Sequence, residues 1–373
     1  MSSPKLLFLV TEDWYFVSHR LALAVAARDA GFDVAVATRV RRHGDIIRRA
    51  GVRLIEFENV RSGLNPLREL ETLLRLIRLY RRERPDVAHH VALKPVLYGS
   101  IAARLARTPR VINAIAGMGW LYTSGSGAAR GLQRVVSGAL AAVLRAGIVL
   151  VQNPDDGELV ARLGVPRAHI RRIAGSGVDL ERFAPAPEPA GIPLVVLPSR
   201  LLWDKGVGEF VAAARQLRAR GVEVRCLLAG DPDPANPAAV PSGQIGAWVA
   251  EGIVEHPGWV EDMPALLAAS SIVCLPSYRE GLPKALIEAA AAGRPIITSD
   301  VPGCREVVRD GENGLLVPAR DSARLTQALE RLLRDPAMRR RMGACGRQRA
   351  EQEFGLDAVI AQTLALYRSC ASC

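Results

Sequence analysis

Two glutamates stand eight positions apart in the segment SYREGLPKALIEAAAAGRPI, at positions 280 and 288. Paired carboxylates could do acid and base chemistry, as they do in glycoside hydrolases. Those enzymes need their two carboxyl groups within about 5 to 9.5 Å of each other. Two residues eight positions apart on one helix are separated by about 12 Å along its axis. The spacing of Glu280 and Glu288 therefore does not favour a hydrolase.

The same segment contains a predicted helix with a phosphate-binding start. Pro283 is typical of a first helical position and Gly293 of the residue after a helix end, so we predict a helix over about 283–292. Glu280 then lies in the turn before this helix and Glu288 lies inside it. The first turn exposes unpaired N–H groups that bind phosphate, and Gly281 lets a ligand approach the backbone. This pattern indicates a clamp on a long polar ligand.

Predicted strands and helices alternate along the chain and carry these residues. Short apolar runs such as LLFLV and DVAVATR are followed by helical segments, which predicts parallel sheets covered by helices. A chain of 373 residues is long for one core, and proline and glycine interrupt the alternation over 182–193. We predict two doubly wound α/β domains, residues 1–186 and 187–356, with a last helix in 357–373 that packs back on the first domain.

Ligands of open parallel sheets bind at the carboxyl ends of the strands. In the second half, the segments that follow predicted strands are SRLLWDKG, AGDPDPANP and SYREGLP. In the first half they are TEDWYFVSHR, HHVALKP and IAGMGWLYTSG. Polar and glycine residues collect in these segments, which predicts two domains facing each other across a cleft.

Charge is distributed unevenly along the chain. Residues 1–186 carry 28 Lys/Arg and 16 Asp/Glu, a net charge of +12, whereas residues 187–373 carry 21 and 22, a net charge of −1. Such a bias indicates an anionic partner surface. Aromatic residues are few and no nucleic-acid-binding motif is present, so we expect a membrane surface and no nucleic acid.

The apolar segments and the cysteines indicate a compartment. The segment 130–151 is interleaved with arginine, and Arg134 and Arg145 bracket ten mostly apolar residues. A bilayer span needs about 20, so this segment could lie on a membrane but should not cross one. We expect no signal peptide, because the first apolar run is short and acids follow it. Six irregularly spaced cysteines suit a reducing cytoplasm. We therefore expect a cytoplasmic protein at the inner face of the cell membrane.

Three segments of the second half together resemble the family-4 retaining glycosyltransferases of GT-B fold. These are GSGVDLERFAP, SRLLWDKG and EGLPKALIEAAAAGRPIITSDVPGCREVVRDGENGLLVP. The first half adds FVSHRLALAVAARDAGFDV, LKPVLYGSIAARLA and AGMGWLY, which look like the branch that extends polyprenyl-diphosphate-linked sugars. The resemblance covers nearly the whole chain and implies two Rossmann-like domains facing an interdomain cleft. It implies no cofactor besides a nucleotide sugar, expected to be UDP-linked.

The resemblance also implies roles for single residues on the donor side. Arg200 and Lys205 match the basic pair that holds the donor diphosphate, and fixed cations there stabilise the charge of the leaving group. Glu280 matches the glutamate that contacts the donor sugar, and Glu288 the one that binds the ribose hydroxyls. The full predicted donor set is Arg200, Lys205, Glu280, Gly281, Leu282, Pro283 and Glu288, with Lys284 as a weaker candidate.

The acceptor side is expected in the first half, on residues that follow its predicted strands. The candidates are His19, Arg20, His89, His90, Lys94, Gly117 and Gly119. Family members often carry a histidine near this strand end, so His90 is a catalytic candidate. The sequence does not choose between His89 and His90.

Asp231 and Asp233 form a DPD motif that mimics the metal-binding carboxylates of the other major glycosyltransferase fold. Because the cationic pair already supplies the positive charge, we expect no catalytic metal.

The sequence thus predicts a retaining, metal-independent hexosyltransferase that uses a lipid-linked acceptor in the assembly of bacterial surface or glycoprotein glycans. Three alternatives stay open: a nucleotide-sugar 2-epimerase of the same fold, a transferase with a soluble acceptor, and a non-catalytic binding subunit.

Overall fold

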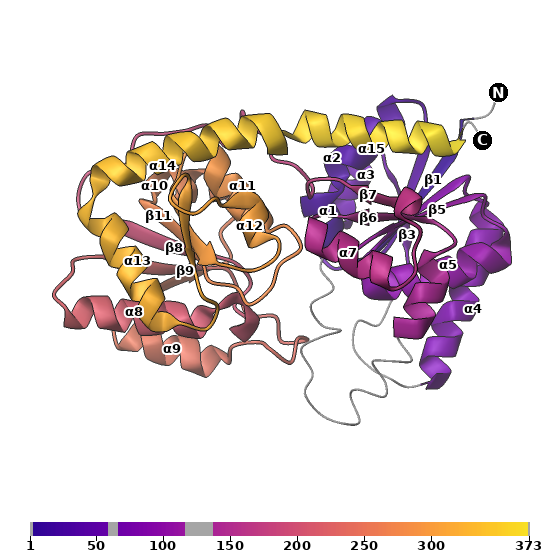
Figure 1. The fold of residues 1–373 in the computed structure, drawn as a ribbon. Coiled ribbons are helices and arrows are strands. Elements are labelled where there is room, and N and C mark those ends of the chain that lie inside the picture. Colours follow the sequence, from indigo (N-terminus) through magenta and orange to yellow (C-terminus); the bar gives the residue numbers. More distant parts are fainter. Residues whose placement is uncertain (1–2, 59–65, 116–136, 372–373) are drawn as a thin grey trace. The chain divides into compact units, whose positions relative to one another are not determined.

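The computed structural model describes residues 3–58, 66–115 and 137–371 (Figure 1). The chain divides into two compact units. The first comprises Met1–Ser176 and Asp357–Cys373, and the second comprises Gly177–Leu356. Each unit is described separately.

The first unit is built on a seven-stranded sheet of order β3-β2-β1-β4-β5-β6-β7, in which every described pair is parallel. Its strands are β1 Lys5–Glu12, β2 Asp33–Arg39, β3 Arg53–Glu56, β4 Val87–Val91, β5 Arg110–Ala114, β6 Ile148–Val151 and β7 Ile170–Arg172. The strand order reverses its direction between β1 and β4, which places a topological switch point at their carboxyl ends.

Helices cover both faces of this sheet. They are α1 Asp13–His19, α2 Leu21–Asp29, α3 Gly44–Arg49, α4 Pro66–Glu83, α5 Leu93–Ala106, α7 Pro154–Arg162, the short η2 Arg167–His169 and α15 Leu356–Ala371. Residues 137–144 are also helical. Leu76 and Tyr80 of α4 are buried in one core layer. Val359 and Tyr367 of α15 are buried in another layer with Phe8 and Phe16, so the last helix of the chain belongs to the first unit.

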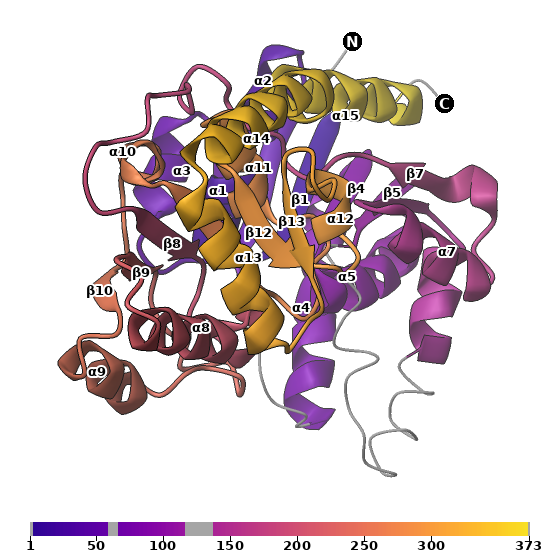
Figure 2. The ribbon, with the colours of Figure 1, turned by 60° about the vertical axis from the view of Figure 1, so that its left-hand side comes forward.

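The second unit has a six-stranded parallel sheet of order β10-β9-β8-β11-β12-β13. Its strands are β8 Leu194–Pro198, β9 Arg225–Ala229, β10 Glu255–Gly258, β11 Ile272–Leu275, β12 Ile296–Ser299 and β13 Gly314–Val317. Its helices are η3 Trp203–Lys205, α8 Val207–Ala219, α9 Ser242–Ala250, α10 Met263–Ala269, α11 Lys284–Ala291, α12 Cys304–Val307, α13 Ser322–Arg334, α14 Pro336–Arg349 and η4 Ala350–Phe354. Helices α13 and α14 both pack against β13, and α13 also packs against β12 (Figure 2).

The predicted helix over 283–292 is α11, which covers Lys284–Ala291. Pro283 caps its start with an extended backbone (φ −72°, ψ 112°). Gly293 follows its end with a φ of 67°, a left-handed conformation that favours glycine.

The boundary between the units lies between Ser176 and Gly177, earlier than the predicted boundary after Ala186. Two arginines of the second unit explain the difference, because they bind the backbone of the segment that leads into β8, residues 177–193, which we call the linker. Arg347 donates to the carbonyls of Leu180 (3.0 Å) and Phe183 (3.1 Å). Arg294 donates to the carbonyls of Ala186 (2.9 Å) and Pro187 (3.3 Å). Proline and glycine mark where the regular pattern breaks, but side-chain hydrogen bonds decide with which unit the segment packs.

Candidate functional site

Lys205, Ser277 and Glu280 meet at the carboxyl edge of the second sheet. Lys205 ends η3 in the loop after β8, and the other two follow β11. Because β8 and β11 are neighbours in the sheet, their carboxyl ends bring these loops together. Lys205 Nζ donates to Glu280 Oε1 at 2.5 Å, and Ser277 Oγ donates to the same oxygen at 2.7 Å. Glu280 is thus held by a cation and a hydroxyl.

Two glycines allow the loops around Glu280 to approach one another. A Cβ on Gly206 would lie 2.2 Å from the carbonyl oxygen of Pro276, and a Cβ on Gly303 would lie 2.5 Å from that of Gly281. Both glycines also have a positive φ, of 73° and 80°. The positions of Lys205 and Glu280 therefore depend on backbone packing that no other residue type fits without a shift.

Arg200 lies two positions after the end of β8 and pairs with the DPD motif. Its Nη1 donates to Asp233 Oδ2 at 2.7 Å. The backbone of the DPD loop also binds this segment, since Leu201 N donates to Asp231 O at 3.0 Å. One aspartate of the motif is thus a counter-ion of a predicted donor-binding cation.

Glu288 and Lys284 lie on the first turns of α11 and form an ion pair of 3.2 Å. Burial raises the pKa of the Glu288 carboxyl from its ordinary value of 4.5, while Lys284 and Arg182 act in the opposite direction. Leu282 is buried before the helix. The structure therefore places the predicted donor residues in one unit, around the carboxyl ends of β8, β9 and β11 and the start of α11.

The charges of this site form three pairs of a cation and a carboxylate: Arg200–Asp233, Lys205–Glu280 and Lys284–Glu288. An arrangement with fixed cations and acceptors beside a helix start can bind a ligand that carries both phosphate and hydroxyl groups. The roles of Ser277 and Gly303 and the pairing of Asp233 were not predicted from the sequence. Of these, only Ser277 has a local signal, which is its position three residues before Glu280 in a strand-to-helix turn.

The two adjacent histidines of β4 point to opposite faces of the first sheet, as successive strand residues do. His90 is fully buried. Its Nε2 lies 2.8 Å from the Tyr80 hydroxyl and its Nδ1 2.8 Å from Asn113 Oδ1. Burial lowers the pKa of His90 to about 4, although the hydrogen bond to Asn113 acts in the opposite direction. Both ring nitrogens are engaged inside the core, so these surroundings lend no support to a catalytic His90.

His89 is buried on the other face. Its Nδ1 lies 2.5 Å from the hydroxyl of Tyr367 on α15, and its ring packs against Phe8 with 5.2 Å between centroids. Burial lowers the pKa of His89 well below 6.5, and Arg20 and His90 add to this effect. Its Nε2 has no hydrogen-bond partner among the described residues. Neither histidine presents an exposed ring.

The other acceptor candidates occupy the start of α2 and the start of α5. The ring of His19 stacks on Tyr15 at 4.1 Å between centroids. Arg20 is buried at the start of α2. Lys94 Nζ pairs with Glu69 of α4 at 2.9 Å. Gly117 and Gly119 lie outside the described residues, and the acceptor residues stay predictions.

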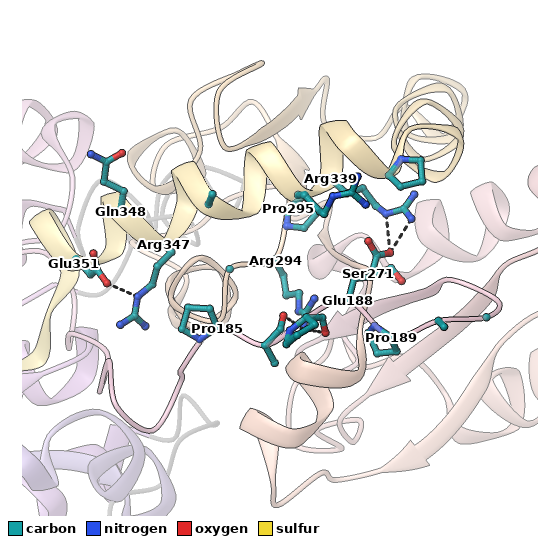
Figure 3. Close-up of a pocket in the computed structure, with 18 residues that line it drawn as sticks. Pro185, Glu188, Pro189, Ser271, Arg294, Pro295, Arg339, Arg347, Gln348 and Glu351 are labelled. Carbon is teal, nitrogen blue, oxygen red and sulfur yellow. Dashed lines mark hydrogen bonds and ion pairs between the residues drawn. The ribbon is translucent and has the colours of Figure 1, made fainter.

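A separate cavity of about 740 Å³ lies in the second unit between the linker and α14. Figure 3 shows that its arginines make contacts within the unit: Arg339 contacts Glu188, and Arg347 contacts Glu351. Arg294 donates to carbonyls on the same wall. None of the predicted donor residues lines this cavity. Three of its arginines anchor the linker, namely Arg294, Arg339 and Arg347.

Two properties of the described residues concern metal binding and membrane crossing. Within residues 3–58, 66–115 and 137–371, no group of three or more His, Cys, Asp or Glu side chains is placed to hold a metal ion. Across the same ranges, no helix has the length and apolar character that a bilayer crossing requires.

Two family models match the chain, one in each half. The model described as "Glycosyl transferases group 1" matches residues 192–335. The model described as "Glycosyl transferase 4-like" matches residues 5–153.

Curated relatives with assigned activities match the chain over different lengths. One is the N,N'-diacetylbacillosaminyl-diphospho-undecaprenol alpha-1,3-N-acetylgalactosaminyltransferase of Campylobacter jejuni. It is 26% identical over 362 residues, which are 93% of this chain and 94% of that protein. Another is the D-inositol 3-phosphate glycosyltransferase of Salinispora tropica, 33% identical over 59% of this chain and 50% of the relative.

Solved structures show the same fold at low sequence identity. Sucrose-phosphate synthase from Thermosynechococcus elongatus superposes with a TM-score of 0.81 and 24% identity, over 98% of both chains. Anabaena HepE in complex with UDP and glucose superposes with a TM-score of 0.80 and 18% identity, over 98% of this chain and 100% of HepE. Both likenesses establish the fold, which is GT-B with two Rossmann-like units.

Proposed function

Because glycosyltransferase family models match both halves of this chain, we propose that it moves a hexose or N-acetylhexosamine from a UDP-sugar to a polyprenyl-diphosphate-linked sugar. The reaction retains the anomeric configuration and needs no metal ion. The observation that carries this proposal is the cluster of Lys205, Arg200 and Glu280 at the carboxyl edge of the second sheet, beside the start of α11.

The proposed roles follow from the charges of these side chains. Lys205 and Arg200 neutralise the charge that builds up on the diphosphate as the glycosidic bond breaks. Glu280, held by Lys205 and Ser277, accepts hydrogen bonds from the donor sugar. Glu288 accepts hydrogen bonds from the ribose hydroxyls, and the N–H groups that begin α11 bind phosphate. The departing phosphate oxygen takes the proton of the acceptor hydroxyl as the new bond forms on the same face.

The acceptor is proposed from the relative that matches nearly the whole chain. That relative is named for transfer to a diacetylbacillosaminyl-diphospho-undecaprenol. A sugar on an undecaprenyl diphosphate is the kind of acceptor used in bacterial O-antigen, capsule, exopolysaccharide or glycoprotein-glycan assembly. We place the reaction in this class of pathway.

Substitution at the cluster tests the transfer reaction. Lys205→Ala and Glu280→Gln should each lower kcat at least about 100-fold, because each removes a group that stabilises the transition state. Melting temperatures should stay close to that of the wild type. Glu255→Gln is the matched control, since Glu255 pairs with Arg225 at the start of β9 and should keep full activity. Wild-type rates in both site variants would contradict the assignment.

A panel of nucleotide sugars identifies the donor. Ligands that bind the folded state raise its melting temperature, so the largest shift among UDP-, GDP- and dTDP-sugars should come from a UDP-sugar. Incubating the protein with that donor and no acceptor distinguishes transferase activity from epimerase activity. An epimerised donor in the absence of acceptor would favour the 2-epimerase alternative.

We also propose that the first unit binds an anionic membrane surface through α4. Leu67, Leu70 and Leu74 are 78%, 53% and 45% exposed, and their spacing puts them on one side of the helix. The next turns of α4 expose Arg75, Arg78, Arg81 and Arg82. An exposed face with leucines followed by arginines suits the boundary between lipid tails and anionic headgroups.

A further inference from the structure

Asp233 holds a position that the proposed mechanism does not explain. Its carboxylate lies 2.7 Å from Nη1 of Arg200. The Asp233 side chain is 15% exposed and that of Arg200 33% exposed. The other two carboxylates that pair with site cations, Glu280 and Glu288, have proposed ligand contacts of their own. Asp233 has none, and a negative charge beside a diphosphate-binding cation opposes the binding of an anion.

The loop that carries Asp233 is fastened to the loop that carries Arg200 and Lys205. Trp203 N donates to Ala238 O at 2.8 Å, and Val240 N donates to Leu201 O at 3.0 Å. A turn closes the loop itself, because Asn236 N donates to Asp233 O at 2.8 Å. Pro232 and Pro234 on either side of Asp233 restrict its backbone further. Asp233 is therefore a fixed charge beside the site.

Two consequences of this charge have opposite signs. As a hydrogen-bond acceptor, Asp233 orients the guanidinium of Arg200, which favours binding of a phosphate. As an anion within about 4 to 7 Å of any phosphate that Arg200 binds, it repels that phosphate. Asparagine has nearly the shape of aspartate and keeps an acceptor oxygen, so it preserves the first effect and removes the second.

We propose that Asp233 is a built-in counter-ion of Arg200 that weakens the binding of the nucleoside diphosphate product and so speeds its release. This inference rests on the proposed function, because it needs Arg200 to bind the diphosphate. The charge of Asp233 acts on donor and product alike. Its main effect falls on the product, whose terminal phosphate carries an extra negative charge once the sugar has left.

The test compares the affinity of UDP for the wild type and for Asp233→Asn by isothermal titration calorimetry. The variant should bind UDP about three- to tenfold more tightly at low ionic strength, the effect expected from one unit charge at this distance in a partly solvated site. The gain should shrink when salt rises from about 0.05 to 0.5 M, because salt screens exposed charges. It should be smaller for UMP, which carries less charge. Stopped-flow release of UDP should be slower in the variant by a similar factor.

Three further variants separate charge from shape. Asp233→Glu keeps the charge and should bind UDP within about twofold of the wild type. Asp233→Ser, a second neutral variant, should also bind UDP more tightly, which keeps the test informative if the asparagine variant folds poorly. Glu255→Gln removes one carboxylate from an Arg225 pair at the amino end of the same sheet, and should leave UDP affinity unchanged.

The possible failures differ from one another. If the wild type binds UDP but both neutral variants bind it equally or more weakly, Asp233 only positions Arg200 and the counter-ion role is overturned. If Glu255→Gln gives the same gain as Asp233→Asn, the effect is a general one of net charge and the inference is also overturned. If the wild type binds no nucleoside diphosphate, the proposed function itself fails and this inference fails with it.

Discussion

Burial and charged neighbours shift the pKa values of single residues in the second unit. Glu288 shows this most clearly, since its carboxyl is buried near the start of α11 while Lys284 lies 3.2 Å away. Burial raises the pKa of Glu288, and the lysine only partly offsets the shift. A buried carboxylate accepts strong hydrogen bonds from hydroxyl groups once it is ionised, and the pH at which it ionises therefore controls binding.

The pKa of Glu288 predicts a pH dependence of nucleotide affinity. Because the pKa is raised, the carboxylate takes up its proton at a pH above 4.5 as the solution is acidified. As the solution is acidified, UDP affinity should therefore begin to fall while the pH is still above 4.5. The protonated form is also favoured by folding, so this group's contribution to stability decreases as pH rises from 4.5 through the raised pKa.

Glu288→Gln should remove this pH dependence and weaken UDP binding about 10- to 100-fold at neutral pH, the range for hydrogen bonds to a charged group. The ribose assignment has its own control, which is 2′-deoxy-UDP. This ligand should lose less affinity in the variant than UDP does. An equal loss for both ligands would place Glu288 away from the 2′-hydroxyl.

At the scale of elements, the site depends on loops and on how they are fastened. The loops after β8, β11 and β12 approach because Gly206 and Gly303 have no side chain at the crossing points. The linker is held by arginines in a different way. Arg294 is 3% exposed and donates to the carbonyls of Leu267 and Ala268 as well as to the linker. One side chain thus joins the end of α10 to the chain entering β8.

Arg294→Met should lower the free energy of unfolding of the second unit by about 3 kcal/mol, because several buried carbonyls lose their charged donor. Chemical denaturation followed by tryptophan fluorescence measures this loss. Arg340 lines the same cavity but is exposed, and Arg340→Met is the matched control with little expected change. A fall of less than about 1 kcal/mol in the Arg294 variant would show that the linker is held by other contacts.

At the scale of the whole molecule, charge separates the two halves of the sequence. The net charge of +12 belongs to residues 1–186 and the net charge of −1 to the rest. The exposed arginines of α4 place part of this charge on the first unit, beside the exposed leucines of the same helix. Figure 1 shows α4 beside α5 at the periphery of that unit, and its inner face contributes Leu76 and Tyr80 to the core.

The membrane proposal predicts co-sedimentation with vesicles that contain about 30% anionic lipid, weakened by high salt as charge is screened. Replacing Leu67, Leu70 and Leu74 by Gln should reduce binding at least about tenfold, because the variant loses its buried apolar area in the lipid. Transfer to a soluble acceptor analogue should be unaffected.

The matched control for this experiment lies in the second unit. Trp259 is 66% exposed there, and its replacement by Gln should leave vesicle binding unchanged. Full binding by the leucine variant would assign the basic surface to another role. If the wild type self-associates and the leucine variant does not, α4 is instead a contact between copies of the chain.

The alternation of apolar runs and helical segments along the chain was enough to predict two α/β units with parallel sheets, although not the short strands β7, β10 and β13. Alternating apolar runs and caps such as Pro283 and Gly293 act locally, and local signals can be read along a chain. Motif spacing likewise placed Arg200, Lys205, Glu280 and Glu288 at strand and helix ends, where topology brings them together. The DPD motif was visible too, but its pairing with Arg200 was not.

Contacts between distant segments could not be predicted from local signals, and they become visible in the folded chain. It places His89 and His90 in the core, because Tyr367 and Tyr80 reach them from helices on opposite faces of the sheet. It moves the unit boundary to Ser176–Gly177, because arginines far along the chain bind the linker carbonyls. It also pairs each of the site cations Arg200, Lys205 and Lys284 with a carboxylate. Composition and spacing record which charges exist, whereas folding decides which of them lie within a few ångströms of each other.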